Sequence, residues 1–279
     1  MSAGSGRRPA LVRSRRPSAR RFRLAATAIL LSLLAGCGAD SGGAAASGGS
    51  SPSGGISGTV TVFAAASLTE SFGTLGRQFE AAHPGVSVRF NFAASSALAQ
   101  SIAQGAPADV LASASAKIMD SAVHAGDATD PRTFARNEME IAVPPDNPAG
   151  VTGAADLARP GLKLAVCQQQ VPCGSTARQV FDRAKITVRP ATLGPDVKAV
   201  LTAVQLGEVD AGVVYRTDVR AAGSKVRGIV IPAGLNASTS YPIATLSEAP
   251  NVAVARAFVD HVLSPAGTTV LTEAGFASP

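Results

Sequence analysis

Short runs of β-branched and aliphatic residues alternate with amphipathic stretches from residue 59 to the C-terminus. The run Thr59–Phe63 predicts a strand. The stretch Ser67–Ala82 predicts a helix, because its apolar residues recur every three or four positions until His83-Pro84-Gly85 ends it. Further strands are predicted at 86–92, 108–112, 139–143, 162–166, 211–214 and 228–231, and further helices at 96–104, 175–184, 197–206 and 252–263. This alternation is typical of α/β architecture.

The chain before residue 59 has a different pattern. Its first 23 residues contain eight Arg and no acidic residue, and the apolar run Leu24–Leu34 follows them. A charged segment before a short apolar segment indicates an export signal, here residues 1–36, and the apolar run is too short to be interpreted as a spanning helix. Arg20-Arg21 also resembles a twin-arginine signal, and the export route stays open.

The apolar run ends in Leu34-Ala35-Gly36-Cys37, which resembles the signal of bacterial lipoproteins. In such proteins the Cys is acylated and becomes the new N-terminus, so Cys37 is expected to be a lipid anchor. The alternative is an ordinary cleavage site beside a chance Cys. Residues 37–58 are rich in Gly, Ser and Ala and carry one charge, Asp40, so we expect a flexible tether.

The basic residues do not indicate a nucleic-acid partner. The formal charge of the whole chain is +6, but eight of the 25 basic residues belong to the predicted signal. The remaining 17 basic residues are outnumbered by 19 acidic ones. The basic character of the chain therefore comes from the export signal, and nucleic-acid binding has no support in the rest of the sequence.

Two further cysteines, Cys167 and Cys173, lie six positions apart on either side of a predicted turn. In an exported protein such a pair is best interpreted as a disulfide bond. Metal binding is the rival interpretation. It is the weaker one, because no His or carboxylate lies near them in the sequence to complete a tetrahedral set of ligands.

Four predicted helices are preceded by small residues or a turn. A helix N-terminus has free backbone N–H groups and the positive end of the helix dipole, so it can bind an anion, and a Ser adds a hydroxyl donor. For Ser67 or Ser95 taken alone, a plain helix cap is the simpler interpretation. Two such starts in an early segment and two in a middle segment suggest two lobes that face one cleft. The four starts are Ala64-Ala-Ala-Ser67, Ala93-Ala-Ser-Ser96, Val171-Pro-Cys-Gly-Ser175 and Gly194-Pro-Asp-Val197.

A set of motifs from residue 59 onward resembles the periplasmic molybdate-binding proteins of ABC transporters. The opening Ala-Ala-Ser-Leu and the Gly-Ala-Pro-Ala-Asp element are specific when they occur together. The motifs, in chain order, are Val62-Phe-Ala-Ala-Ala-Ser-Leu-Thr69, Phe92-Ala-Ala-Ser-Ser-Ala-Leu98, Gly105-Ala-Pro-Ala-Asp-Val110, Gly207-Glu-Val-Asp-Ala-Gly-Val-Val-Tyr215 with Asp218, and Tyr241-Pro-Ile-Ala244.

The resemblance implies two α/β lobes of the periplasmic-binding-protein kind that close on one tetrahedral oxyanion. We expect residues 59–140 with 233–279 in the first lobe and 141–232 in the second, with chain crossings near Ile141–Pro144 and Ile231–Gly234. The implied ligand is molybdate. Tungstate is expected too, since it nearly matches molybdate in size and charge. The implied partner is a membrane permease of an ABC transporter, and no cofactor, metal cation or catalytic activity is implied.

Carried over residue by residue, the resemblance assigns neutral donors to the anion. Ser67 and Ser95 would give hydroxyl and backbone N–H groups, although Ser96 stays open as an alternative to Ser95. Cys173 and Val197 would each give a backbone N–H, and Tyr215 its phenol. A molybdate dianion has no proton to donate, so such a site needs donors only. Asp196, the one acidic residue at the four starts, is expected to cap its helix from outside the pocket.

Three rival functions fit the residues less well. A serine hydrolase needs a nucleophile elbow and a reachable His, but Ser67 lies in Ala-Ala-Ser-Leu-Thr, and the three His are expected to be solvated. An iron receptor would need several Tyr and carboxylates, and the chain has two Tyr. A receptor for another oxyanion such as sulfate is the serious alternative, because the radius of the pocket cannot be inferred from the sequence.

Overall fold

The computed structural model describes residues 55–279. The predicted export signal, Cys37 and most of the predicted tether lie outside the described residues. Within residues 55–279, no helix is both long enough and apolar enough to cross a bilayer.

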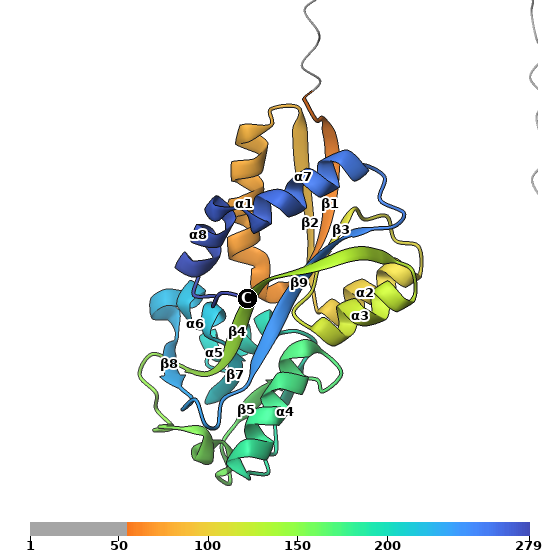
Figure 1. Cartoon of the computed structure of the whole chain (residues 1–279). Coiled ribbons are helices and arrows are strands. Elements are labelled where there is room, and N and C mark those ends of the chain that lie inside the picture. The colour runs from red at the N-terminus through yellow and green to blue at the C-terminus, as the bar shows by residue number, and fades with distance from the viewer. Residues whose placement is uncertain (1–54) are drawn as a thin grey trace, which may run out of the picture. The chain divides into compact units, whose positions relative to one another are not determined.

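The described chain forms two α/β lobes that share strands (Figure 1). Strand β1 (Gly58–Ala65) pairs in parallel with β2 (Val86–Ala93) and β3 (Val110–Ala112), and β3 pairs antiparallel with β9 (Ser238–Leu246). The helices of this first lobe are α1 (Thr69–Ala82), α2 (Ser95–Ala103), α3 (Ala116–His124), α7 (Val252–Leu263) and α8 (Pro265–Glu273). Their apolar faces and the strands enclose two clusters of buried side chains.

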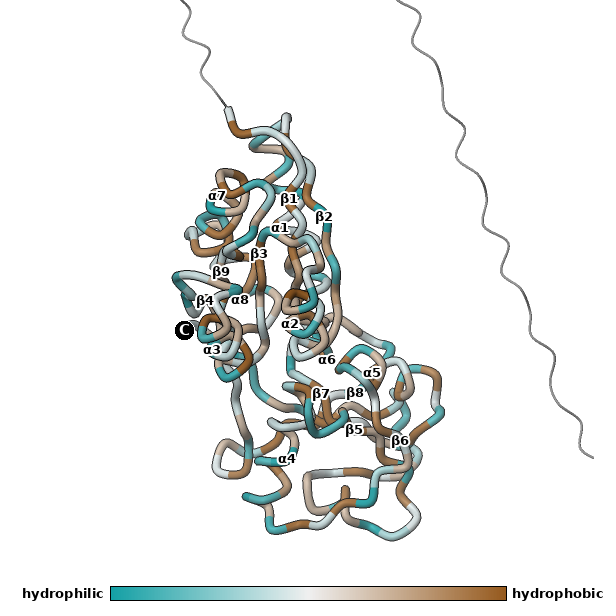
Figure 2. Tube along the Cα trace, turned by 90° about the vertical axis from the view of Figure 1, so that its right-hand side faces the viewer, coloured by the Kyte–Doolittle hydropathy of each residue, from teal (hydrophilic) through white to brown (hydrophobic). Residues whose placement is uncertain are grey.

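The second lobe is built on a smaller sheet. Strand β5 pairs in parallel with β6 and β7. Buried apolar residues of the strands and of the helices that pack on them form the core of this lobe. The elements of the second lobe are β5 (Leu164–Cys167), α4 (Pro172–Ala184), β6 (Thr192–Gly194), α5 (Val197–Gln205), β7 (Ala211–Tyr215), α6 (Arg216–Ala222) and β8 (Arg227–Val230). Figure 2 shows the two groups of elements one above the other, with α4 and α5 in the lower group.

Strand β4 (Ala128–Val143) belongs to both lobes. Its residues from Ala128 to Glu138 pair with β9 of the first lobe, and those from Met139 onward pair with β7 and β8 of the second. The long β4–β9 ladder runs through the middle of the molecule (Figure 1). The two lobes therefore meet along continuous strands, and the change of partner falls at Glu138 and Met139.

One buried side chain ties the two connections between the lobes together. The Asn236 amide oxygen accepts from Met139 N at 3.2 Å, and its nitrogen donates to Met139 O at 2.9 Å. Asn236 precedes β9, and Met139 is the residue at which β4 changes sheets. The side chain thus fixes the register of the two crossing segments where a hinge would have to bend.

Several elements differ from the expected ones. Helix α4 begins at Pro172, three residues earlier than predicted, because Pro suits the first helical position, where no N–H is needed. The strand predicted at 139–143 is the last third of the 16-residue β4. The sequence analysis missed three α-helices, α3, α6 and α8, and two strands, β6 and β9.

The Gly-Ala-Pro-Ala-Asp element has a structural role. The Asp109 side chain is 2% exposed, and its two carboxylate oxygens accept from Thr61 N and from Asn251 N, each at 2.7 Å. One carboxylate therefore joins β1, the start of β3 and the N-cap residue of α7.

We expect Asp109→Ala to lower the free energy of unfolding by about 2 to 4 kcal/mol, because two backbone N–H groups lose a charged acceptor. Asp109→Asn should cost less, since its amide oxygen can still accept one of the two bonds. Urea denaturation measures both effects. Asp120→Ala, at an exposed position of α3, is the control and should stay within about 0.5 kcal/mol of the parent. Equal losses for Asp109→Ala and Asp120→Ala would contradict the role of Asp109.

Candidate functional site

The four predicted helix starts converge on one cavity between the lobes. The cavity volume is about 20 Å³, far less than the roughly 300 to 1,000 Å³ of pockets that hold organic ligands. All five residues that the sequence analysis assigned to an anion line this cavity. The lining residues are Ala65, Ala66, Ser67, Ala93, Ala94, Ser95, Ala114, Pro172, Cys173, Asp196, Val197 and Tyr215.

The first lobe contributes two buried serines. Ser67 lies in a single turn of 3-10 helix before α1, where its hydroxyl oxygen is 2.8 Å from the Tyr241 hydroxyl. Ser95 is the first residue of α2, and its hydroxyl oxygen accepts from Ala114 N at 2.9 Å. Ser96 is half-buried and does not line the cavity. Ser67 and Ser95 therefore both line the cavity, and each hydroxyl has a hydrogen-bond partner within the first lobe.

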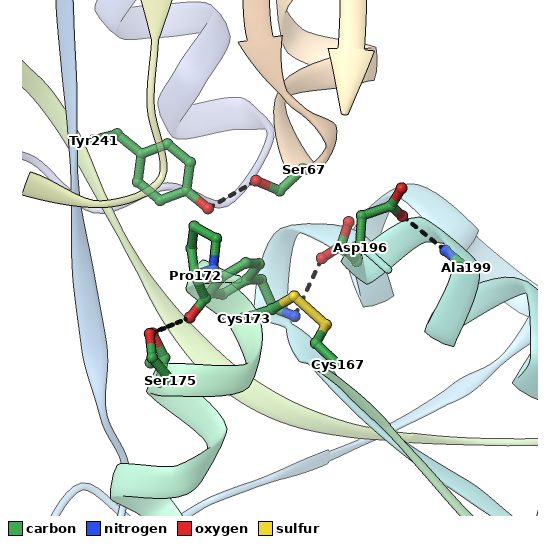
Figure 3. The surroundings of a disulfide bond; sticks show 11 residues. Ser67, Cys167, Pro172, Cys173, Ser175, Asp196, Ala199 and Tyr241 are labelled. Carbon is green, nitrogen blue, oxygen red and sulfur yellow. Dashed lines mark hydrogen bonds between the residues drawn. A yellow bond between two sulfur atoms is a disulfide. The ribbon is translucent and has the colours of Figure 1, made fainter. Parts of the chain in front are cut away.

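The second lobe contributes the first turn of α4. The structure contains the disulfide bond between Cys167, at the end of β5, and Cys173, the second residue of α4 (Figure 3). A side chain at Gly174 would place its Cβ 1.9 Å from the Gln168 carbonyl oxygen, so the turn is packed too closely for any other residue. The first N–H groups of a helix have no partner within it. The bridge and Gly174 thus hold the Cys173 N–H at the cavity.

Helix α5 brings the second N-terminus of this lobe. Its first residue, Val197, is buried, and Asp196 is the N-cap, whose carboxylate accepts from Ala199 N at 3.0 Å. The cap is as predicted. Asp196 nevertheless lines the cavity, so the expectation that it lies outside the pocket was wrong. It does so because an N-cap residue must adjoin the same free N–H groups that face the cavity.

Tyr215 lies at the end of β7 and is 1% exposed. Its hydroxyl has no hydrogen-bond partner among the described residues, although it is buried. Burial raises the pKa of this phenol well above its usual range, so the group is protonated and can donate. An unpartnered buried hydroxyl costs about 1 to 3 kcal/mol. This hydroxyl is therefore available to donate a hydrogen bond to a group in the cavity.

The cavity has no cationic lining: across residues 55–279, no Lys, Arg or His contributes to its wall. The nearest cation in sequence, Lys198, points to carboxylates instead. Its ammonium lies 2.8 Å from a Glu70 oxygen and 3.0 Å from an Asp218 oxygen. Glu70 is on α1 of the first lobe and Asp218 on α6 of the second, so the ion pairs connect the lobes.

Asp218 is fully buried. One of its oxygens faces Lys198, and the other accepts from Tyr215 N at 3.1 Å, so the carboxylate holds the backbone of Tyr215 in place. Burial raises the pKa of Asp218 to about 6, against the opposing effect of Lys198. Burial opposes the charge of Lys198 as well, but the Asp218 and Glu70 carboxylates outweigh it and raise the pKa of Lys198.

Sequence reasoning missed the groups behind the lining residues. Tyr241 and Asp218 occurred only as part of motifs, while Asn137, Lys198 and Glu70 were not considered. The burial of an acid such as Asp218 leaves no signal in a single sequence. In the part of the chain that the structure describes, no group of three or more His, Cys, Asp or Glu is placed to hold a metal ion.

A two-lobed α/β body with a small cavity between its lobes, lined by helix starts and without basic side chains among residues 55–279, is typical of a solute-binding protein. Residues 60–277 match the family model described as bacterial extracellular solute-binding protein. This match spans more than half of the chain, and the chain belongs to that family.

The chain is also similar to individual proteins. It is 42% identical over 254 residues to the molybdate-binding protein ModA of Mycobacterium tuberculosis, which covers 91% of this chain and 96% of the relative. The periplasmic molybdate-binding protein of Azotobacter vinelandii superposes with a TM-score of 0.70 at 20% identity, covering 79% of this chain and 99% of that structure. The sulfate-binding protein SubI of M. tuberculosis superposes with a TM-score of 0.67 at 18% identity over 79% of this chain and 86% of its own. At these identities the two structures show a shared fold alone.

We expect Lys198→Met to destabilise the protein in a pH-dependent way. The raised pKa of Asp218 means that this group favours folding below pH 4 and that the benefit is lost as the pH rises through about 6. Without Lys198 the pKa of Asp218 should rise further. The loss of stability should therefore be about 3 kcal/mol or more at pH 8, where an unpaired charge stays buried, and about 1 kcal/mol or less at pH 5.

Urea denaturation at the two pH values measures the difference. Glu70→Gln is the matched control, because it removes the half-exposed partner of Lys198 and leaves Asp218 paired. Its effect should be at most about 1 kcal/mol at either pH. A Lys198→Met loss that is the same at pH 5 and pH 8 would argue against a buried charge on Asp218.

Proposed function

We propose that this protein is an extracytoplasmic receptor that captures molybdate, and also tungstate, and delivers it to the permease of an ABC transporter. The observation that carries the proposal is the Tyr215 hydroxyl, buried without a partner at a cavity formed by helix N-termini. The 42% identical relative, whose name states that it binds molybdate, supports the choice of anion.

The proposed site matches the chemistry of a deprotonated tetrahedral dianion. Ser67, Ser95 and Tyr215 would donate from hydroxyl groups, and Cys173 and Val197 from backbone N–H groups at helix starts. Among the described residues, Asp196 is the one carboxylate at the wall, and its bond to Ala199 N directs one of its oxygens to its own helix. Because no Lys, Arg or His of residues 55–279 lines the wall, the anion would be held by fixed dipoles.

The domain organisation is proposed on the same basis. Residues 1–36 would be the export signal, residues 37–58 the tether with Cys37 as its lipid anchor, residues 59–140 with 233–279 the first lobe, and residues 141–232 the second. Motion of one lobe against the other would open the cavity. We propose a binding function and no catalysis, because the sequence offers neither a nucleophile elbow at Ser67 nor a His at the cavity wall among the described residues.

Sulfate is the alternative ligand, since a sulfate-binding protein has the same fold. Isothermal titration of the purified protein with molybdate, tungstate, sulfate and phosphate separates these cases. Molybdate and tungstate should bind tightly. Hydrogen phosphate should bind weakly, because its proton would meet mainly donors, and the carboxylate among the described lining residues, Asp196, already accepts from Ala199 N.

We expect molybdate to raise the melting temperature. A ligand at 100 times its dissociation constant stabilises the folded state by about 2.7 kcal/mol, which corresponds to roughly 5 to 10 °C for a domain of this size. Differential scanning calorimetry with and without molybdate measures the shift. The absence of a shift with millimolar molybdate and with millimolar tungstate would exclude the proposed ligands.

Substitution of either serine tests how the anion is held. Ser67→Ala and Ser95→Ala each remove a hydrogen bond to a charged group, so molybdate affinity should fall by about 1.5 to 3 kcal/mol, or roughly 10- to 150-fold. Arg77→Gln on α1 and Arg178→Gln on α4 are the controls for general electrostatic attraction, and both should bind within about threefold of the parent. Normal binding by both serine variants together with a large loss in an arginine variant would show that the anion lies elsewhere.

A further inference from the structure

A serine hydroxyl can donate a hydrogen bond or accept one. In a site made partly of serines, the hydroxyl groups therefore donate to an anion only if neighbouring groups fix the orientation of each O–H bond. The question matters most for Ser67, because its neighbour Tyr241 is itself a hydroxyl and either group could donate across the 2.8 Å that separate the two oxygens.

A third buried side chain settles the direction of this bond. The Asn137 amide nitrogen lies 2.8 Å from the Thr217 hydroxyl oxygen and 3.4 Å from the Tyr241 hydroxyl oxygen. The orientation of the amide follows from its other end, where its oxygen accepts from Glu138 N at 3.0 Å. Asn137 thus presents an NH₂ group to Tyr241, and an NH₂ group of an amide donates and does not accept.

Of the two hydrogen-bond partners that Tyr241 has among residues 55–279, the Ser67 oxygen is the one that can accept its proton. Tyr241 is 0% exposed, and its hydrogen-bond partners among the described residues are Ser67 and Asn137. The hydroxyl of the other phenol nearby, Tyr215, has no hydrogen-bond partner within residues 55–279, and the two ring centroids are 6.2 Å apart. If Ser67 donated to Tyr241 instead, the Tyr241 proton would be buried without an acceptor.

We infer that Tyr241 is a positioning residue of the oxyanion site, whose hydroxyl donates to Ser67 and so leaves the Ser67 proton free for the bound anion. This inference rests on the proposed function. The chain of hydrogen bonds runs from Asn137 through Tyr241 and Ser67 toward the cavity. Each bond in such a chain polarises and strengthens the next one, so the Ser67 hydroxyl becomes a better donor.

The Ser95 hydroxyl oxygen also accepts a hydrogen bond, in this case from a backbone N–H group. The Ser95 oxygen accepts from Ala114 N, a backbone group that can only donate. The proton of Ser95 is likewise left for the cavity. Each serine oxygen therefore accepts a hydrogen bond from a donor on the side away from the cavity. Of these two donors, a side-chain substitution can remove only the Tyr241 hydroxyl, because the other is a backbone N–H.

Tyr241→Phe tests the inference in the purified protein, with molybdate as the titrant. The ring should keep its contacts with Phe134 and Phe276, and a melting curve checks that the variant is folded. Molybdate affinity should fall by about 3- to 10-fold, the effect of one neutral hydrogen bond. If Ser67 instead donated to Tyr241, it would face the anion with lone pairs, and removing the Tyr241 hydroxyl would tighten binding.

The double variant shows whether Tyr241 acts through Ser67. In a Ser67→Ala background, Tyr241→Phe should change molybdate affinity by less than about twofold. The chain contains two Tyr, and the other one supplies a matched control with the same chemical change. Tyr215→Phe removes a proposed direct donor, so its loss of affinity should persist in the Ser67→Ala background.

The outcomes separate this inference from the proposed function. If the parent protein does not bind molybdate, the proposed function fails. If the parent binds molybdate but Tyr241→Phe binds equally well or more tightly, or loses the same factor with and without the Ser67 hydroxyl, the proposed function stands and the role of Tyr241 is overturned.

Discussion

The pairing of β4 with β9 determines where the two halves of the cavity meet. The two strands pair from Ala128 to Glu138, and β4 then continues into the second sheet without a break. The serines of the first lobe and the helix starts of the second are attached to sheets that share this strand. Asn236 fixes the register where β4 changes sheets. A shift of one residue there would turn every side chain of the β4 segment to the opposite face and separate the halves of the site.

In the described part of the chain, no basic side chain lines the cavity. Lys198 follows the helix start at Val197, but its ammonium forms ion pairs with the Glu70 and Asp218 carboxylates. The positive potential at the cavity then comes from helix N-termini, whose position is fixed by the fold. Fixed dipoles need no reorganisation when an anion arrives, whereas a flexible Lys must lose side-chain freedom to bind one. Lys198 serves to connect the lobes beside the site.

The fold and the lining of the cavity could be predicted from the sequence to different degrees. The first helix, the strands that became β1, β2 and β7, and the start of α5 follow local patterns of apolar residues and caps, so they were predicted within a few residues. Strand β9 was missed because Pro242 interrupts a run that is otherwise strand-like, and α8 because its signal, Ser264 before Pro265, follows another helix directly. Both elements depend on tertiary contacts that one sequence does not reveal.

The groups that support the site could not be predicted, for a physical reason. Ser67 and Tyr241 are 174 positions apart, and Asn137 and Tyr241 are 104 apart, so their hydrogen bonds exist only because β4, β9 and the start of α1 come together. The lining residues could be found from helix starts because a free N–H group is a local property of a helix. The direction of a hydroxyl is a property of the whole network around it. A donor such as the Cys173 N–H is fixed by its own turn, through the disulfide bond and Gly174, but the Ser67 hydroxyl acquires its direction only when the first lobe is folded around Tyr241. Selectivity for an anion without protons would then depend on residues that never touch the anion.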